Sequence, residues 1–334
     1  MKAAVIGGGS WGSAFALHLG RLNIPTLLWI REGDILAQLH NTRENTTFLP
    51  GFRFPDPISF SGSLEEAVKD SDILFFAVPS KFCRSVFEGI APFACSDQIF
   101  VSLTKGIEED SLMRMSEVIT DVFSPAFSPR TAVLSGPSFA REVAGACPTA
   151  VVIASSDREL ARTIQNMISN PLFRCYSSTD MPGVELAGSI KNIIAVAAGI
   201  SDGLQLGYNS RAALITRGIA EISRLGKKLG AKTETFLGLA GIGDLVLTCT
   251  GELSRNHRVG FEIGRGRRLP AILSDSRMVA EGITTSRSVK KLSAAVPCEM
   301  PISEQVFAVL HENKEPQTAL NELMTRSLKD EFYA

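Results

Sequence analysis

The first half of the chain alternates short apolar runs with segments whose apolar residues recur at helical spacing. The run 3–6 ends at a group of glycines, residues 10–22 then follow a helical pattern, and 26–30 is a second apolar run. This order predicts a strand, a tight turn, a helix and a second, parallel strand. The chain therefore opens with one β-α-β unit.

The same alternation continues as far as residue 180. Strands are predicted at 73–78, 99–103, 131–134, 150–154 and 173–176, and helices at 81–90, 111–123 and 158–168. Strands that alternate with helices predict an α/β fold. We therefore expect a Rossmann-type, doubly wound, mostly parallel sheet.

Long helical patterns replace the short strands after residue 180. The segments 184–199 and 210–229 have helical spacing, and several shorter helices are predicted up to residue 328. This change predicts a Rossmann-type domain over residues 1–180 and an all-α domain over residues 181–334.

Composition and charge narrow the class of protein. Among 334 residues, 45% are hydrophobic and 21% are charged, and the net charge of -1 gives no overall field that favours nucleic acid. The six cysteines are scattered without a CxxC pair, so we expect reduced thiols and no metal site. No signal peptide is recognisable, and the apolar stretch 193–200 is too short to cross a bilayer. We expect a cytoplasmic protein without a membrane span.

A glycine motif lies between the first strand and the first helix. Gly7, Gly9 and Gly12 have the spacing that allows a tight turn, a close approach of the backbone to a pyrophosphate, and close packing of helix on sheet. The helix that follows presents unpaired amides to an anion. Because the strand, the helix and the second strand all agree with the motif, the sequence predicts dinucleotide binding.

The end of the second strand bears on the choice of cofactor. An acid that binds the ribose 2′-hydroxyl of NAD is usual there, but this chain has Arg31 followed by Glu32. An arginine at this place can bind the 2′-phosphate of NADP. We expect NADP(H) and leave NAD(H) open as a second cofactor. In the alternative interpretation Arg31 is exposed and Glu32 accepts the ribose.

Lys191 lies in a helical segment, 186–196, that is apolar on nearly every side. A lysine that is partly removed from water has a lowered pKa, as a general base requires. In the alternative, its stem runs along an apolar surface and its ammonium stays in water. Lys191 is therefore a candidate for the proton-transferring residue.

Two further segments of the second half carry candidate ligand groups. Asp244 lies in a glycine-flanked stretch, 241–245, that is expected to be a loop in which the backbone can approach a ligand. Ser254 can cap a helix, and Arg255 can then form a fork onto a phosphate. A plain helix cap followed by solvated charges is the alternative interpretation.

Together these segments closely resemble the bacterial type of NAD(P)-dependent glycerol-3-phosphate dehydrogenases, from residue 5 to near residue 305. Phe48 and Ser138 depart from the family, in which tyrosine and threonine are frequent at these places. Neither change removes a residue on which the chemistry would depend. The matching blocks are 7–12, 48–51, 77–80, 104–107, 134–140, 191–192, 238–245, 254–256 and 279–282.

The resemblance implies that residues 1–180 bind the dinucleotide and that residues 181–334 bind the substrate and carry out catalysis, with Lys191 as the proton acceptor. It also implies a homodimer. Besides the glycines, the cofactor would be contacted by Ser10, Trp11, Arg31, Lys105, Ala140, Arg255, Val279 and Glu281. The triose phosphate would be surrounded by Lys105, Gly136, Ser138, Lys191, Asp244, Ser254, Arg255 and Asn256.

The expected reaction is the reduction of dihydroxyacetone phosphate to sn-glycerol 3-phosphate, for glycerophospholipid synthesis. One alternative is a related Rossmann and helical dehydrogenase that acts on a 3-hydroxy acid or its coenzyme A ester, because Arg255 would bind a carboxylate nearly as well as a phosphate. Another is a catalytically silent module that binds NADPH and senses redox state. The presence of both Lys191 and Asp244 weighs against the silent module.

Overall fold

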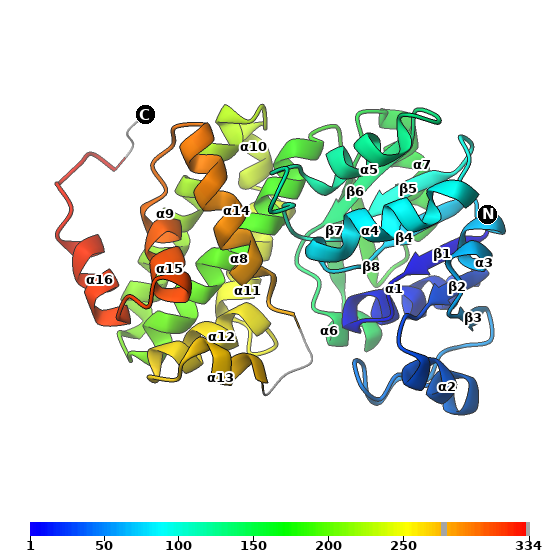
Figure 1. Cartoon of the computed structure of the whole chain (residues 1–334), viewed down its shortest axis with the longest axis horizontal. Coiled ribbons are helices and arrows are strands. Elements are labelled where there is room, and N and C mark those ends of the chain that lie inside the picture. Colours follow the sequence, from blue (N-terminus) through cyan, green and yellow to red (C-terminus); the bar gives the residue numbers. More distant parts are fainter. Residues whose placement is uncertain (275–278, 332–334) are drawn as a thin grey trace.

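The computed structural model of the chain describes residues 1–274 and 279–331. Its N-terminal half is a sheet covered by helices, and its C-terminal half is a group of helices beside it (Figure 1). The first unit consists of β1 (Ala3–Ile6), α1 (Ser10–Arg21) and β2 (Thr26–Trp29). Strands β1 and β2 pair in parallel, as the apolar pattern predicts.

The sheet has eight strands in the order β3-β2-β1-β4-β5-β6-β7-β8. All neighbours are parallel except β6 and β7, which are antiparallel. The predicted α/β fold with a mostly parallel sheet is therefore confirmed. The bounds of the other strands are β3 (Ile58–Ser61), β4 (Ile73–Phe76), β5 (Ile99–Ser102), β6 (Arg130–Ser135), β7 (Thr149–Ala154) and β8 (Phe173–Ser178).

Two apolar cores cover the two faces of this sheet. Along β1, Ala3 and Val5 belong to one core, whereas Ala4 and Ile6 belong to the other. This follows from the alternation of side chains along a strand, and it explains why a strand buried on both faces is a continuous apolar run. The helices in this half are α2 (Gly33–Thr42), α3 (Leu64–Lys69), α4 (Ser80–Ile90), α5 (Met115–Phe123), α6 (Ala140–Ala144) and α7 (Arg158–Ile168).

The helical half is built around α8 (Met181–Gly203), which begins three residues after β8 ends. Helix α8 is long and apolar enough to cross a membrane, but its apolar window lies entirely inside the protein, as a core helix does. A domain division at residue 180 stays a prediction. The other helices are α9 (Gly207–Lys228), α10 (Thr233–Phe236), α11 (Asp244–Thr250), α12 (Arg255–Gly264), α13 (Leu269–Ser274), α14 (Glu281–Ala295), α15 (Pro301–His311) and α16 (Pro316–Met324).

Helices α8 and α12 pack with their backbones in direct contact. Gly199 on α8 and Gly260 on α12 face the partner helix, and Gly203 and Gly264 repeat the contact one turn further along. A Cβ atom on Gly260 would collide with the carbonyl oxygen of Val196. This contact holds the start of α12 at a set position relative to Lys191 and its neighbours on α8.

Candidate active site

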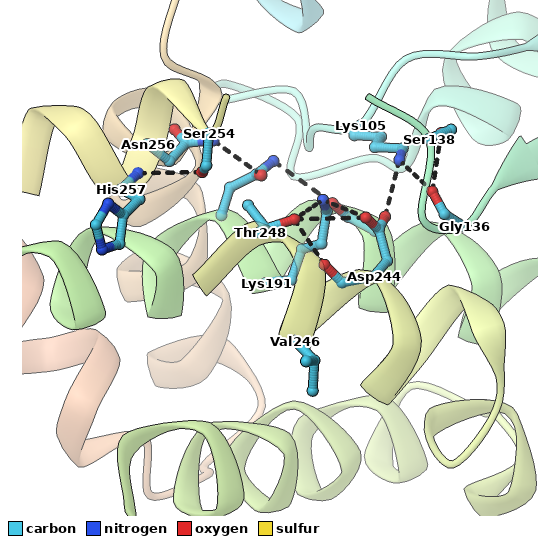
Figure 2. Close-up of polar contacts among 12 residues, drawn as sticks. Lys105, Gly136, Ser138, Lys191, Asp244, Val246, Thr248, Ser254, Asn256 and His257 are labelled. Carbon is cyan, nitrogen blue, oxygen red and sulfur yellow. Dashed lines mark hydrogen bonds and ion pairs between the residues drawn. The ribbon is translucent and has the colours of Figure 1, made fainter. Parts of the chain in front are cut away.

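Lys191 projects from α8 into the protein interior, where the residue is 5% exposed. Its Nζ donates hydrogen bonds to Asp244 Oδ1 at 2.7 Å and to Thr248 Oγ1 at 2.5 Å (Figure 2). The ammonium is therefore held by protein groups. The alternative in which it escapes to water along an apolar surface is wrong.

The electrostatic surroundings of Lys191 make it suited to proton transfer. Burial, helped by the nearby charge of Lys105, lowers the pKa of Lys191 to about 8, against the attraction of the Asp244 carboxylate. A group with this pKa can exist in both protonation states near neutral pH. The structure thus gives this lysine the property that the sequence suggested.

Asp244 connects two lysines. It is 1% exposed, and while Oδ1 accepts from Lys191, Oδ2 accepts from Lys105 Nζ at 2.8 Å. Lys105 Nζ also donates to Gly136 O at 3.0 Å, and Ser138 Oγ donates to the same carbonyl at 2.9 Å. Because Lys105 follows β5 and Gly136 follows β6, the network lies at the carboxyl ends of these strands, where ligands of open α/β sheets bind.

The segment before Asp244 differs from the expected loop. Residues Leu239–Gly243 form a turn that is kinked at Gly241, whose φ of -91° and ψ of -105° are not helical, and Asp244 is the first residue of α11. A Cβ on Gly241 would collide with the carbonyl oxygen of Phe236. The glycine there serves a close backbone contact within the protein, and the turn directs Asp244 towards Lys191.

Two residues that the sequence reasoning did not single out belong to the same site. Thr248 lies one turn after Asp244 on α11, accepts from Lys191 and donates to Asp244 O at 2.6 Å. Asn192 follows Lys191 on α8, and its Oδ1 accepts from Asn256 Nδ2 at 2.9 Å. The sequence could have identified Thr248, because residues four apart share one face of a helix and Thr248 lies four residues after Asp244.

The start of α12 brings three candidates together. Ser254 Oγ accepts from the amide of His257 at 3.2 Å, which confirms the predicted helix cap. Asn256 Oδ1 accepts from the amide of Gly282 at 2.9 Å, so this residue links α12 to α14 as well as to α8. Arg255 points the other way, towards the sheet.

Arg255 connects the helical half to the glycine turn. One of its terminal nitrogens donates to Ser10 Oγ at 2.7 Å, and Ser10 Oγ in turn donates to Phe48 O at 2.7 Å. Ser10 is the first residue of α1. The candidate phosphate ligand of the substrate therefore lies beside the candidate pyrophosphate site of the cofactor.

The glycine turn has the shape that a dinucleotide requires. Gly7 has φ +120°, and a Cβ there would lie 2.6 Å from Ala77 O, while a Cβ on Gly12 would collide with Gly7 O. Gly9 instead has no atom within 4 Å of an added Cβ, which leaves the backbone open to a ligand. The first amides of α1 have no acceptor within the helix, and Trp11 Nε1 is buried without a partner in the described part of the chain. These features fit a pyrophosphate at the start of α1.

Arg31 lies apart from the lysine network, just beyond the end of β2. It donates to Glu32 Oε1 at 2.7 Å, and its guanidinium lies 5.4 Å from the centre of the Phe82 ring. The residue is exposed, as the alternative interpretation expected, and it follows the end of β2, the position that usually faces the ribose in folds of this type.

The remaining candidates are Glu281, Ala140 and Val279, and Glu281 links the helical half to the sheet half. Glu281 begins α14, and its carboxylate accepts from the Ser80 amide at 3.0 Å and from Ser80 Oγ at 2.5 Å. Ala140 begins α6, and Val279 is the first described residue after the gap. Within residues 1–274 and 279–331, no group of three or more His, Cys, Asp or Glu residues is arranged to hold a metal ion.

Comparison with known proteins agrees with this geometry. The model of the NAD-dependent glycerol-3-phosphate dehydrogenase N-terminus matches residues 2–161, and that of the C-terminus matches residues 180–321. The chain belongs to this dehydrogenase family. It is thus an oxidoreductase that uses NAD(P)(H), and the resemblance found in the sequence is confirmed.

Individual relatives support the family assignment over the whole chain. A protein of Geobacter sulfurreducens named glycerol-3-phosphate dehydrogenase (NAD(P)+) is 50% identical over 330 residues, covering 99% of this chain and 98% of the relative. One of Syntrophotalea carbinolica with the same name is 48% identical, covering 99% and 100%. The crystal structure of glycerol-3-phosphate dehydrogenase from Coxiella burnetii is 38% identical, with a TM-score of 0.94 and coverage of 97% and 99%.

More distant structures share only the fold of this dehydrogenase. A ketopantoate reductase from Ralstonia eutropha has a TM-score of 0.60 at 14% identity, covering 96% of this chain and all of that one. At this identity, a common fold carries no conclusion about the substrate. The choice among substrates depends on the site residues.

Proposed function

We propose that this dehydrogenase interconverts dihydroxyacetone phosphate and sn-glycerol 3-phosphate, with Lys191 as the group that transfers the proton. The observation that carries the proposal is the buried hydrogen bond between Lys191 and Asp244, in a chain whose relatives are named for this reaction. A cytoplasmic location and a role in supplying glycerophospholipid synthesis follow from the resemblance and form part of the proposal.

The chain's own residues account for the proton. A bound nicotinamide would supply the hydride for the C2 carbonyl carbon. Lys191 Nζ would donate a proton to the carbonyl oxygen as that oxygen gains negative charge. Asp244 and Thr248 hold the ammonium in place beforehand through their hydrogen bonds. In the opposite direction, neutral Lys191 removes the proton from the C2 hydroxyl.

Substrate binding is assigned to the groups that surround the lysine. Arg255 and Asn256 at the start of α12 would bind the phosphate, and Asp244 would orient the substrate hydroxyls. Ser254 would act through the shape of this turn, because its hydroxyl caps α12. Phosphate binding away from C2 positions the carbonyl for reaction. Lys105, Gly136 and Ser138 would line the opposite side, where they share hydrogen bonds.

Cofactor binding is assigned to the glycine turn and its neighbours. Gly7, Gly9 and Gly12 with the amides of Ser10 and Trp11 would hold the pyrophosphate. Arg31 would bind the 2′-phosphate of NADP(H), and Glu32 stays the alternative acceptor for a ribose hydroxyl. The other residues assigned to cofactor binding are Lys105, Ala140, Arg255, Val279 and Glu281.

An assay of NADPH oxidation with a panel of substrates tests this function. The panel is dihydroxyacetone phosphate, phosphate-free dihydroxyacetone, a 3-oxo acid and its coenzyme A ester. We expect rapid oxidation with dihydroxyacetone phosphate alone. Faster turnover of the acid or its ester would favour the related dehydrogenase, and no turnover with any substrate would favour a silent redox sensor.

We also propose that two copies of the chain pair through the helical half. A groove of about 700 Å³ among α8, α9, α15 and α16 is lined mainly by apolar side chains. Met324 and Leu328 at its edge are 76% and 101% exposed, and Tyr208 nearby is 81% exposed. A two-fold interface must complement itself, and a groove beside projecting apolar side chains meets this requirement.

Light scattering tests the pairing by giving the mass in solution. We expect twice the chain mass for the unmodified protein. A variant with both Met324→Asp and Leu328→Asp should have the mass of one chain. If the unmodified protein had the mass of one chain, or if the variant kept twice that mass, pairing through this groove would be contradicted.

A further inference from the structure

A second cluster of charged side chains, outside the Lys191 network, joins three helices. Asp202 near the end of α8 accepts a hydrogen bond from His257 Nε2 of α12 at 2.6 Å. Arg211 of α9 donates to both oxygens of Asp202, at 2.7 Å and 3.0 Å. Because a carboxylate only accepts, the His257 nitrogen in this contact carries a proton. The proposed chemistry gives none of these three residues a role.

His257 is held at three points. Its amide donates to Ser254 Oγ, and its ring donates to Asp202. Its carbonyl oxygen packs closely against Gly199 of α8, so that a Cβ on this glycine would collide with it. It directly follows Asn256, so these contacts hold the first turn of α12. That turn carries the two proposed phosphate ligands, Arg255 and Asn256.

We propose that His257, held by Asp202 and Arg211, is a positioning residue that directs Arg255 and Asn256 towards the substrate phosphate. This inference rests on the proposed function. Asp202 lies on the same helix as Lys191, eleven residues further along, or roughly 16 Å at the helical rise. The cluster therefore fixes the phosphate-binding turn relative to the helix that carries the proton donor.

The close contact of α8 and α12 offers a purely structural explanation of the same cluster. In that case the glycine contacts alone would place the turn, and His257 would only stabilise the fold. The two explanations predict different effects of removing His257 on different substrates. A misplaced phosphate ligand affects substrates that carry a phosphate, whereas a loss of stability does not depend on which substrate is present.

The test compares the kcat/KM values of His257→Ala for two substrates, dihydroxyacetone phosphate and phosphate-free dihydroxyacetone. We expect about a tenfold loss with the phosphorylated substrate, mainly through KM, because small displacements of positioning groups are costly. The value for dihydroxyacetone, which is measured at high enzyme concentration because this substrate is very poor, should stay unchanged. His257→Gln, whose amide can donate to Asp202, should restore most of the loss. Arg258→Ala, an exposed neighbour on α12, is the matched control and should behave as the unmodified enzyme.

Two outcomes would overturn the inference. The first is an equal loss of kcat/KM with both substrates, and the second is an unchanged kcat/KM with a lowered melting temperature. If His257→Ala does not fold, Asp202→Asn retains the shape of the side chain and should show the same phosphate-selective loss. Failure of the proposed function would be visible earlier, because the unmodified enzyme would then not reduce dihydroxyacetone phosphate.

Discussion

At the residue scale, the site places one carboxylate between two ammonium groups. Asp244 is bonded to both Lys191 and Lys105, so the three groups carry a net positive charge when all are ionised. If one lysine is removed, Asp244 stays paired with the other, so the buried carboxylate keeps a compensating charge. The surplus positive charge favours an anionic substrate, and the burial makes Lys191 easier to deprotonate.

The pH dependence of the two reaction directions should be opposite. Reduction needs protonated Lys191, whose pKa is lowered to about 8 by burial. Because the protonated form is lost as the pH rises through this value, the turnover number for reduction should fall there. The turnover number for glycerol 3-phosphate oxidation should rise over the same range. Steady-state profiles in both directions measure this, and parallel profiles would argue against Lys191.

Cofactor choice should depend on Arg31. Replacement by Asp removes a charged contact to the 2′-phosphate, so NADPH binding should weaken by roughly 1.5–3 kcal/mol. NADH binding should change much less. Glu32→Gln is the matched variant. If Glu32 accepts a hydrogen bond from a ribose hydroxyl, this variant should bind NADH more weakly. Fluorescence titration measures the dissociation constants of both cofactors. If Arg31→Asp weakened NADPH and NADH binding equally, the assignment of Arg31 would be contradicted.

At the element scale, the sequence predicted the strongly patterned elements and missed weakly patterned ones such as α2 and β3. The helix at Arg158–Ile168 has the predicted bounds, because its apolar residues repeat clearly. Strand β3 was missed, since its four residues carry only two apolar side chains. The turn before Asp244 was interpreted as a loop because glycines usually break helices, whereas here Gly241 allows a backbone contact.

The contact between α8 and α12 is predicted to matter for both stability and binding. In Gly260→Ala the new methyl group must displace the Val196 carbonyl, which should destabilise the fold by about 1–3 kcal/mol despite the better helix propensity of alanine. The KM for dihydroxyacetone phosphate should also rise. Gly33→Ala, on α2 with open space around it, is the control. A melting temperature equal to that of the control would show that the helices are not so closely packed.

At the scale of the whole molecule, the site is assembled from segments far apart in the chain. Arg255 and Ser10 are 245 residues apart, Glu281 and Ser80 are 201 apart, and Lys105 and Asp244 are 139 apart. The resemblance named most of these residues, and the β-α-β pattern located the glycine turn. Single-sequence patterns carry no information on such pairings, so the network around Asp244 and the contact of Arg255 with Ser10 required the structure.

Arg255 should give the enzyme much of its affinity for the phosphate group of the substrate. Arg255→Ala removes a charged contact, which should raise the KM for dihydroxyacetone phosphate roughly 10- to 100-fold. Phosphate-free dihydroxyacetone should be a very poor substrate of both proteins, with little difference between them. Arg258→Ala again serves as the control for loss of a positive charge on α12. Comparable turnover of dihydroxyacetone and its phosphate by the unmodified enzyme would exclude Arg255 as the phosphate ligand.

The most direct test of the account is the turnover number of Lys191→Met. Methionine retains much of the stem of lysine and removes the proton, so it separates proton transfer from packing. The dissociation constant for NADPH should stay nearly unchanged, because the glycine turn lies in the other half of the molecule. Reduction of dihydroxyacetone phosphate should slow by about 10²- to 10⁴-fold, the usual contribution of a positioned proton donor. Near-normal turnover by a folded Lys191→Met variant would contradict the proposed mechanism.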